Sequence, residues 1–258
     1  MAKTIAVVNQ KGGVGKTTSA VNLAAAVAAK GRRVLIVDID PQGNTTSGLG
    51  LNKRDIRTSS YDVIINAVPV EKVMLHTEFT NLWILPSSMN LAGAELELVD
   101  MSHRENKLKN SLSLIKGAFD FIFLDCPPSL GLITLNALCA ADTVLVPIQC
   151  EYYALEGLSQ LMSTIRQVKR LYNPSIDMEG VLLTMFDGRL NLTHQVVDEL
   201  KRFFPKKVYN TVIPRNVKLS EAPSFGLPIL YYDKTSKGAA AYNELADEFL
   251  SLNGKGIK

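Results

Sequence analysis

Runs of apolar residues alternate along the chain with segments of helical periodicity. Several apolar runs show no polar alternation, which is typical of parallel strands buried on both faces. The runs predict strands at Thr4–Val8, Val34–Asp38, Leu82–Leu85, Phe121–Asp125, Thr143–Pro147, Gly180–Thr184 and Val208–Ile213. The periodic segments predict helices at Thr17–Ala29, Leu91–Val99, Glu105–Lys116, Leu132–Ala140, Leu155–Leu171, Leu192–Phe203 and Ser236–Leu252. This alternation predicts a doubly wound α/β fold with a mostly parallel β-sheet flanked by helices on both faces.

The length and composition favour one large domain over residues 1–258, with 47% hydrophobic residues. A polar segment with two glycines, Asn44–Ser60, predicts a mobile loop near the functional site. No apolar run approaches the ~18 residues of a membrane span, and the chain enters its first strand without a signal peptide, so we expect a cytoplasmic protein. Cys126, Cys139 and Cys150 adjoin apolar runs and form no CxxC pair, which predicts buried free thiols.

The first predicted strand leads into a glycine-rich loop and then into a helix. This context predicts a phosphate-binding loop, because glycines let successive N–H groups turn toward anionic oxygens and the helix adds its positive N-terminal end. Lys16 can reach the β- and γ-phosphates, and the Thr17 hydroxyl can ligate Mg²⁺. We therefore expect ATP and Mg²⁺ as cofactors. The expected nucleotide-binding residues are Lys11, Gly12, Gly13, Val14, Gly15, Lys16, Thr17 and Thr18.

Three aspartates stand at the carboxyl ends of predicted strands, where a doubly wound sheet gathers its ligands. Asp40 could orient or deprotonate the attacking water, and Asp38 could help to hold Mg²⁺ through a water molecule. The alternative for both is that they only cap the following turn. Asp125 ends the apolar run Phe121–Asp125, which is the Walker B arrangement, and would bind the Mg²⁺ shell through water.

The phosphate loop departs from the ordinary G-x-x-x-x-G-K-[ST] pattern, since Gln10 replaces the first glycine and Lys11 adds a second lysine. This loop resembles the deviant Walker A family of P-loop NTPases, which includes ParA/Soj partition proteins, MinD and the nitrogenase iron protein. The resemblance implies an ATP-sandwich homodimer in which Lys11 reaches the partner's phosphates. It also implies that Asp40 is catalytic beside Lys11 and Lys16, and that basal hydrolysis is slow. Segments resembling the family's adenine-flanking regions contain Met185, Pro214 and Asn216.

The charge is distributed unevenly, although the net charge is only +3. Residues 189–218 carry seven basic and two acidic side chains, so this segment is +5 and the remainder is −2. Such a region favours a polyanionic partner, and a merely solvated basic face is the alternative. The basic residues are Arg189, Lys201, Arg202, Lys206, Lys207, Arg215 and Lys218.

Three segments, Asp38–Gly43, Asp125–Gly131 and Ser220–Gly226, are similar to the chromosomal ParA, or Soj, branch of the family. The resemblance implies chromosome partition: ATP-bound dimers coat nucleoid DNA without sequence preference, and a ParB-type centromere-binding protein stimulates hydrolysis and releases them. Nucleoid association is therefore expected. The residues that resemble DNA-contacting positions are Arg189, Arg215 and Lys218, with Lys201, Arg202, Lys206 and Lys207 as additions to the basic patch.

Two other functions stay open. One is a positioning ATPase of the MinD or flagellar-placement type, which would act on a membrane or on protein partners. The last predicted helix carries Glu244, Asp247 and Glu248 on its outer face, whereas a helix for anionic lipid would be basic, so no membrane partner is expected. The other is a metabolic ATP-dependent ligase of the dethiobiotin-synthetase type, which would need a small-molecule pocket.

Overall fold

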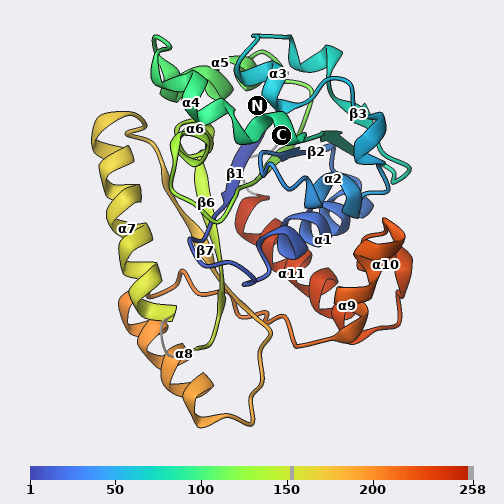
Figure 1. Ribbon diagram of the computed structural model, residues 1–258. Coiled ribbons are helices and arrows are strands. Elements are labelled where there is room, and N and C mark those ends of the chain that lie inside the picture. The colour runs from blue at the N-terminus through green and yellow to red at the C-terminus, as the bar shows by residue number, and fades with distance from the viewer. Residues whose placement is uncertain (152–153, 255–258) are drawn as a thin grey trace.

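A seven-stranded sheet forms the centre of the computed structural model, which describes residues 1–151 and 154–254 (Figure 1). The strand order is β3-β4-β2-β5-β1-β6-β7, and every neighbouring pair is parallel except β3 and β4. The predicted doubly wound, mostly parallel sheet is thereby confirmed. The strands are β1 (Lys3–Val7), β2 (Val34–Asp38), β3 (Leu75–His76), β4 (Leu82–Leu85), β5 (Phe121–Asp125), β6 (Thr143–Gln149) and β7 (Asp177–Thr184).

Helices cover both faces of the sheet (Figure 1). One face carries α1 (Lys16–Ala29), α2 (Asn44–Gly48), α9 (Val217–Glu221), α10 (Ile229–Tyr232) and α11 (Lys237–Asn253). The other carries α3 (Ser60–Ile64), α4 (Ala94–Val99), α5 (Lys107–Ser113), α6 (Leu132–Ala140), α7 (Ala154–Leu171) and α8 (Asn191–Phe203). Short 3₁₀ helices are η1 (Lys53–Asp55), η2 (Val70–Lys72), η3 (Met89–Ala92), η4 (Arg104–Asn106) and η5 (Ala222–Phe225). None of the helices in residues 1–151 and 154–254 is both long and apolar enough to cross a membrane.

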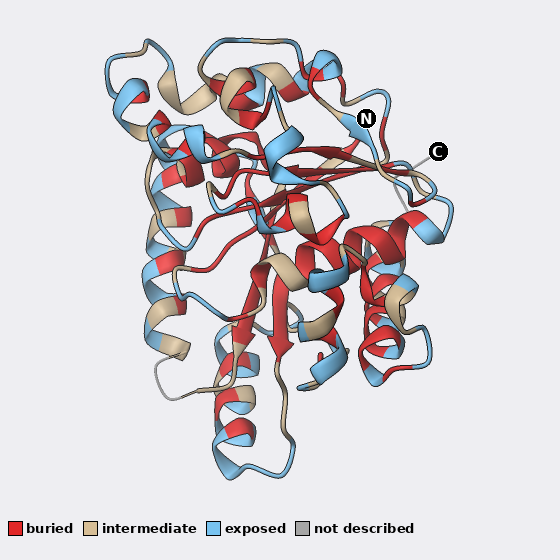
Figure 2. Ribbon diagram, turned by 45° about the vertical axis from the view of Figure 1, so that its right-hand side comes forward, coloured by how far each residue is buried: buried red, intermediate tan, exposed pale blue. Residues whose placement is uncertain are grey.

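The sheet lies between two apolar layers, so its strands are buried on both sides (Figure 2). In the layer of α1 and α11, the ring of Phe249 packs at 5.0 Å from Phe121 and 5.6 Å from Phe123, measured between ring centroids. All three rings are fully buried. The last helix is thus part of the core, with Tyr242, Leu245 and Phe249 buried.

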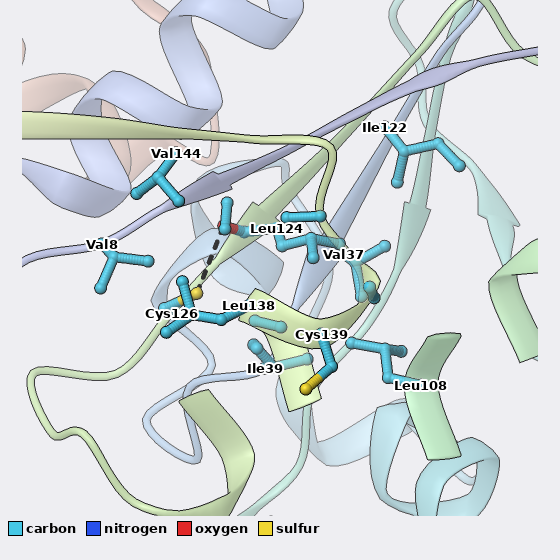
Figure 3. Packing of buried hydrophobic residues seen from close by; sticks show 14 of the residues in the cluster. Val8, Val37, Ile39, Leu108, Ile122, Leu124, Cys126, Leu138, Cys139 and Val144 are labelled. Atoms are coloured by element: carbon cyan, nitrogen blue, oxygen red, sulfur yellow. Dashed lines mark hydrogen bonds between the residues drawn. The ribbon is translucent and has the colours of Figure 1, made fainter. Parts of the chain in front are cut away.

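The opposite layer contains two of the three cysteines. Figure 3 shows Cys126 and Cys139 among apolar side chains, with the Cys126 thiol donating to the carbonyl of Leu124 at 3.6 Å. Burial raises the pKa of the Cys139 thiol to about 12, which keeps it protonated and unreactive at neutral pH. These two are buried free thiols as predicted, whereas Cys150 is partly exposed.

The predicted strand Val208–Ile213 is wrong. This segment runs beside β7, and the amides of Tyr209 and Ile213 donate to carbonyls of β7, but it forms isolated bridges, Val181 with Val208 and Phe186 with Pro214, in place of a continuous strand. The reason is a competing acceptor on α11, because the backbone N–H groups of Asn210 and Thr211 donate to the carboxylate of Glu248, each at 2.8 Å. A buried-strand pattern cannot reveal that a distant carboxylate takes these donors.

The predicted loop Asn44–Ser60 is also wrong over most of its length. It begins with α2, continues through η1, and ends where α3 starts. Thr45 and Thr46 on α2 are fully buried, because their hydroxyls donate to Asp125 and Asp38. The polar residues of this segment thus have two surroundings: Thr45, Thr46, Ser59 and Ser60 are buried, whereas residues 52–55 and Arg57 are exposed to solvent.

We expect Thr4→Val to stabilise the protein. The side chain of Thr4 on β1 is fully buried, and its hydroxyl has no hydrogen-bond partner among residues 1–151 and 154–254. Replacing this hydroxyl by a methyl group removes an unsatisfied buried group, which is worth about 1 kcal/mol and a melting-temperature rise of roughly 2–4 °C. Thermal and denaturant unfolding measure the change. Thr143→Val is the control of opposite sign, since the Thr143 hydroxyl donates to Glu179 at 2.6 Å; a loss of stability in both variants would contradict the argument.

Candidate functional site

The carboxyl ends of β2, β5 and β1 meet at one edge of the sheet. Asp38 at the end of β2 pairs in register with Asp125 at the end of β5, and Asp125 pairs with Val7 of β1. The phosphate loop follows β1 and leads into α1. The structure therefore brings the predicted acids and the predicted loop to one place, as the parallel topology requires.

The loop is held in its curled form by glycines and by two side chains. Gly13 and Gly15 have φ of +74° and +84°, in the left-handed region that favours glycine. The Lys16 ammonium folds back and donates to the carbonyl of Lys11 at 2.9 Å. The Thr184 hydroxyl at the end of β7 donates to the carbonyl of Val14 at 2.8 Å, which fixes the loop against the sheet.

A cavity of about 340 Å³ opens over this loop and the N-terminus of α1. Lys16 is nearly buried beneath it, and burial lowers the pKa of its ammonium, an effect that the carboxylates of Asp125 and Asp40 oppose. The cavity thus combines a buried cation with the positive end of a helix, which suits a polyphosphate. Its lining residues are Gly12, Gly13, Gly15, Lys16, Thr17, Thr18, Asp40, Gln42, Asn44, Pro128 and Met185.

Asp125 lies below the cavity and is fully buried. Its Oδ2 accepts hydrogen bonds from the hydroxyls of Thr17 and Thr45, both at 2.8 Å, and its Oδ1 has no partner in the described part of the chain. Burial raises the pKa of Asp125, against the effect of the two hydroxyls. An orphaned carboxylate oxygen beside a threonine of the phosphate loop fits a hydrated Mg²⁺, which prefers oxygen ligands. Thr17 and Asp125 are therefore the residues that would hold the metal.

Asp38 and Asp40 have different surroundings. The Oδ2 of fully buried Asp38 accepts from the amide of Thr46 at 2.8 Å and from its hydroxyl at 2.7 Å, while Oδ1 accepts from the Asp40 amide at 3.2 Å. Burial, and then the charge of Asp125, raises the pKa of Asp38. These contacts hold the following turn, which is the alternative weighed for Asp38, and a metal role for it stays a prediction. Asp40 lines the cavity, and within the described part of the chain its carboxylate accepts one hydrogen bond, from Gln42 N–H at 2.9 Å.

Two residues of this site were missed by the sequence analysis. Thr45 contacts Asp125, and Ser87 after β4 donates from its hydroxyl to the carbonyl of Asp40 at 2.7 Å. The Ser87 amide also donates to the Thr46 hydroxyl at 2.9 Å. No motif marks these residues, and only the Thr45-Thr46 pair following Asp38–Gly43 gives a signal in the sequence.

A second cavity, of about 250 Å³, adjoins the first and shares Gly15, Thr18 and Met185 with it. Its apolar walls beside a phosphate site suit a nucleotide base, and the predicted Met185, Pro214 and Asn216 all line it. Met185 stands where the cavities meet and has a φ of +49°, a strained conformation for this residue type. Additional lining residues are Thr184, Ile213, Arg215, Leu219, Ser220, Pro223 and Tyr242.

Lys11 does not line the phosphate cavity. Its exposed ammonium forms an ion pair with Glu151, which follows β6. Of the two lysines of the loop, Lys16 alone lines the phosphate cavity.

The basic residues form two separate groups. Arg189 is highly exposed and bonds Asp187 through two nitrogens, at 2.8 and 2.6 Å, which lowers the pKa of Asp187 to about 2. Arg215 lines the base cavity, and Lys218 on α9 pairs with Glu221 at 2.8 Å. Lys201, Arg202 and Lys206 lie beyond, at the other end of α8, whose 13 residues span roughly 20 Å. The structure does not bring all the basic positions together.

Comparison with known proteins identifies the family. A family model described as an AAA domain matches residues 2–178. The chain is 55% identical over 254 residues to the sporulation initiation inhibitor protein Soj of Bacillus subtilis, covering 98% of this chain and 100% of that protein. It is 52% identical over 250 residues to the chromosome partitioning protein ParA of Myxococcus xanthus, covering 97% and 88%. The chain belongs to the ParA/Soj family of chromosome-partitioning ATPases. The resemblance drawn from the phosphate loop and from Asp38–Gly43, Asp125–Gly131 and Ser220–Gly226 is therefore confirmed.

Solved structures support the fold of this ParA/Soj chain. A cobyrinic acid a,c-diamide synthase from Mycobacterium smegmatis with bound ADP and magnesium superposes with a TM-score of 0.86 at 38% identity, covering 100% of this chain and 98% of that one. The cell division ATPase MinD of Pyrococcus furiosus superposes with a TM-score of 0.81 at 28% identity, covering 98% and 100%. The MinD-like P-loop NTPase fold is thus shared over the whole described chain.

We expect Asp125→Asn to raise the free energy of unfolding of the nucleotide-free protein at alkaline pH. Because burial raises the pKa of Asp125 in the folded state, ionising it costs folding free energy as pH rises through that pKa. Below the unfolded-state pKa of about 3.9, both states are protonated and the advantage disappears. At about pH 8 the free energy of unfolding of the variant should exceed that of the unsubstituted protein by on the order of 2 kcal/mol. Denaturant titrations of both proteins at about pH 8 and about pH 4 measure this difference.

Asp120→Asn is the control of opposite sign. Burial raises the pKa of Asp120, but hydrogen bonds from Arg33 outweigh this effect and lower it. The Asp120→Asn variant is therefore expected to be less stable than the unsubstituted protein at alkaline pH and equally stable in acid. A stability difference for Asp125→Asn that is independent of pH would contradict the role given to burial.

Proposed function

We propose that this chain is a partition ATPase that forms an ATP-sandwich homodimer, binds double-stranded DNA without sequence specificity, and is released when a ParB-type protein stimulates hydrolysis. The supporting observation is the phosphate cavity, which combines Lys16, Asp40 and Asp125 in a chain 55% identical to Soj. We also infer that residues 1–258 form one domain, since both apolar layers share a single sheet. The protein would act at the nucleoid in the cytoplasm, because the DNA that it is proposed to bind lies there.

ATP would bind with its triphosphate over the loop and its base in the adjoining cavity. Lys16 and the amides of the loop would neutralise the β- and γ-phosphates. Thr17 and Asp125 would hold Mg²⁺, which supplies positive charge to the phosphates when bound. Asp40, nearly buried and held in a turn by the Gln42 amide, would orient the attacking water and accept its proton.

Slow basal hydrolysis follows from what the phosphate cavity contains. No arginine of the described residues lines it, so an arginine finger is not supplied from within the chain. Lys11 would supply the missing charge across a two-fold interface. Its pair with Glu151 is exposed, and such pairs contribute at most about 1 kcal/mol, so exchanging that carboxylate for a partner's phosphates is inexpensive. The dimer and the partner protein together would complete the site.

The DNA surface would consist first of Arg189, Arg215 and Lys218. Arg215 also lines the base cavity, so this part of the surface is contiguous with the nucleotide site. Lys201 and Lys206 would contact phosphates of the DNA backbone at a greater distance from the nucleotide site. One monomer offers few such contacts, and a dimer of fixed geometry doubles them, which makes binding depend on ATP.

A metabolic ATP-dependent ligase is the second candidate, favoured by the structural likeness to the cobyrinic acid a,c-diamide synthase. A ligase would consume ATP faster when a small carboxylic acid is added in the absence of DNA, and it would convert that acid into a new product. Stimulation by DNA and a ParB-type protein alone would exclude it.

DNA binding should be sequence-independent and require an ATP analogue. Because the contacts are to phosphates, the logarithm of the binding constant should fall by roughly 0.9 per neutralised phosphate for each decade of salt. Lys218→Glu and Arg189→Glu should weaken binding equally on unrelated duplexes, and Lys72→Glu, an exposed charge outside residues 189–218, should not. Fluorescence anisotropy with two duplexes of different sequence measures this. A strong preference for one duplex, or equal affinity with ATP analogue and ADP, would count decisively against the proposal.

Asp40→Asn should trap the ATP-bound dimer. The asparagine keeps the oxygen that accepts from Gln42 N–H but cannot take a proton, so hydrolysis should fall on the order of 10²–10⁴-fold while ATP affinity holds. Rapid-quench hydrolysis and size-exclusion chromatography with ATP measure both properties.

Lys11→Ala is the contrasting variant in the same experiment. It should bind ATP as a monomer, because Lys11 lies outside the phosphate cavity, and fail to give the dimer peak. Hydrolysis by Asp40→Asn at the unsubstituted rate would remove Asp40 from the mechanism, and a normal dimer of Lys11→Ala would refute its role across the interface.

A further inference from the structure

The short helix α2 contacts both the carboxylates of the site and the segment joined to α9. At its start it contacts the carboxylates of the site, and just beyond its end it contacts the segment that follows α9. A helix of only five residues has no stability of its own, so its position follows from these contacts.

The first contact joins α2 to the residue that would hold the metal. The fully buried Thr45 donates its hydroxyl to Oδ2 of Asp125, the same oxygen that accepts from Thr17 of the phosphate loop. Any change in the charge or orientation of this carboxylate therefore acts directly on both hydroxyls. Thr46 strengthens the attachment, since its amide and hydroxyl both donate to Asp38.

The second contact is between two backbones. Gly50, two residues beyond α2, and Gly226, at the end of η5, have φ of +83° and +67°. A Cβ added at Gly226 would lie 2.6 Å from the Cα of Gly50, and a Cβ at Gly50 would lie 3.3 Å from the carbonyl oxygen of Gly226. With no side chain between them to adjust, a displacement of one backbone must displace the other.

The Gly226 end of this contact continues directly into the basic surface. η5 follows α9 without a break, and the Leu227 and Gly226 amides donate to carbonyls of η5, at Ala222 and Pro223. α9 carries Lys218, whose amide donates to the side chain of Asn216 at 2.9 Å. A shift of η5 thus moves the residues of the DNA surface and one wall of the base cavity together.

We propose that α2 transmits a change in the orientation of the Asp125 carboxylate, made when phosphates and Mg²⁺ bind, to the α9 surface. Thr45 is the positioning residue at one end of this connection, and the Gly50–Gly226 contact is at the other. This inference rests on the proposed DNA binding, which it deepens by naming the connection that makes binding depend on the nucleotide. In this proposal the phosphate loop binds the phosphates, and α2 connects the site with the α9 surface.

Thr45→Val and Gly226→Ala interrupt the connection at its two ends, and each has a matched control. Thr4→Val removes a buried hydroxyl without a partner, and Gly31→Ala places a Cβ at φ +84° with no neighbour within 4 Å. Gly31→Ala therefore reproduces the backbone strain of Gly226→Ala without its close contact. Thr45→Ser keeps the hydroxyl and should behave as the unsubstituted protein, which separates the hydrogen bond from the fold.

The measurements are the ratio of DNA affinities with ATPγS and ADP, the dimer fraction with ATPγS, and the difference in hydrogen exchange of residues 217–221 between the ATPγS and ADP states, both with Mg²⁺. Because Leu219 and Ser220 line the base cavity, a base would contact α9 in either state, and the difference between the two states is what tests α2. We expect both interrupting variants to dimerise with ATPγS while the affinity ratio falls by about tenfold or more, equivalent to about 1.4 kcal/mol of coupling. Exchange of residues 217–221 should no longer differ between ATPγS and ADP, whereas exchange of residues 44–48 should still differ. The controls should retain both responses.

An unchanged affinity ratio or an unchanged exchange response in Thr45→Val or Gly226→Ala, relative to its control, would overturn the inference. The exchange measurement needs no DNA. If the unsubstituted protein binds no DNA but the exchange of its α9 still differs between ATPγS and ADP in a way that depends on Thr45, the proposed function fails and the connection stands.

Discussion

Two carboxylates buried side by side, at the ends of β2 and β5, are the constraint around which the rest of the site is arranged. Taking two like charges out of water is costly unless donors or cations compensate. The donors come from α2 through Thr45 and Thr46, from the Thr17 hydroxyl and from the Asp40 amide, and the nearly buried ammonium of Lys16 adds a positive charge. One oxygen of Asp125 receives no donor in the described chain. A site arranged in this way stores electrostatic free energy that a cation and an anion, bound together, would release.

Much of the fold could be predicted because its signals are local. Buried parallel strands are continuous apolar runs, so six of the seven predicted strands, from Thr4–Val8 to Gly180–Thr184, lie on observed ones. The failures have long-range causes. Val208–Ile213 has the composition of a strand, but two of its amides, those of Asn210 and Thr211, donate to Glu248 of α11. The two-residue edge strand β3 is too short to produce a period.

The candidate site divides in the same way. Residues of the phosphate loop and the acids at strand ends could be predicted, because their spacing and their place after a strand encode their position. Thr45 and Ser87 could not, since each acts through a contact that only the folded chain creates. The contrasting surroundings of Asp38 and Asp40 were likewise invisible, because two residues apart in sequence they face different partners. The basic segment predicted charge but not its division between the two ends of α8.

The base cavity is completed by the last helix of the chain. Tyr242 of α11 lines it, and its hydroxyl lies 3.2 Å from the Ser19 hydroxyl of α1, a pairing between the two ends of the sequence. During synthesis, the phosphate loop leaves the ribosome long before α11 does. A nascent chain therefore has a phosphate loop but no enclosed base site until α11 has been synthesised. Nucleotide capture, and any assembly that depends on it, is in this way reserved for chains that extend beyond Tyr242.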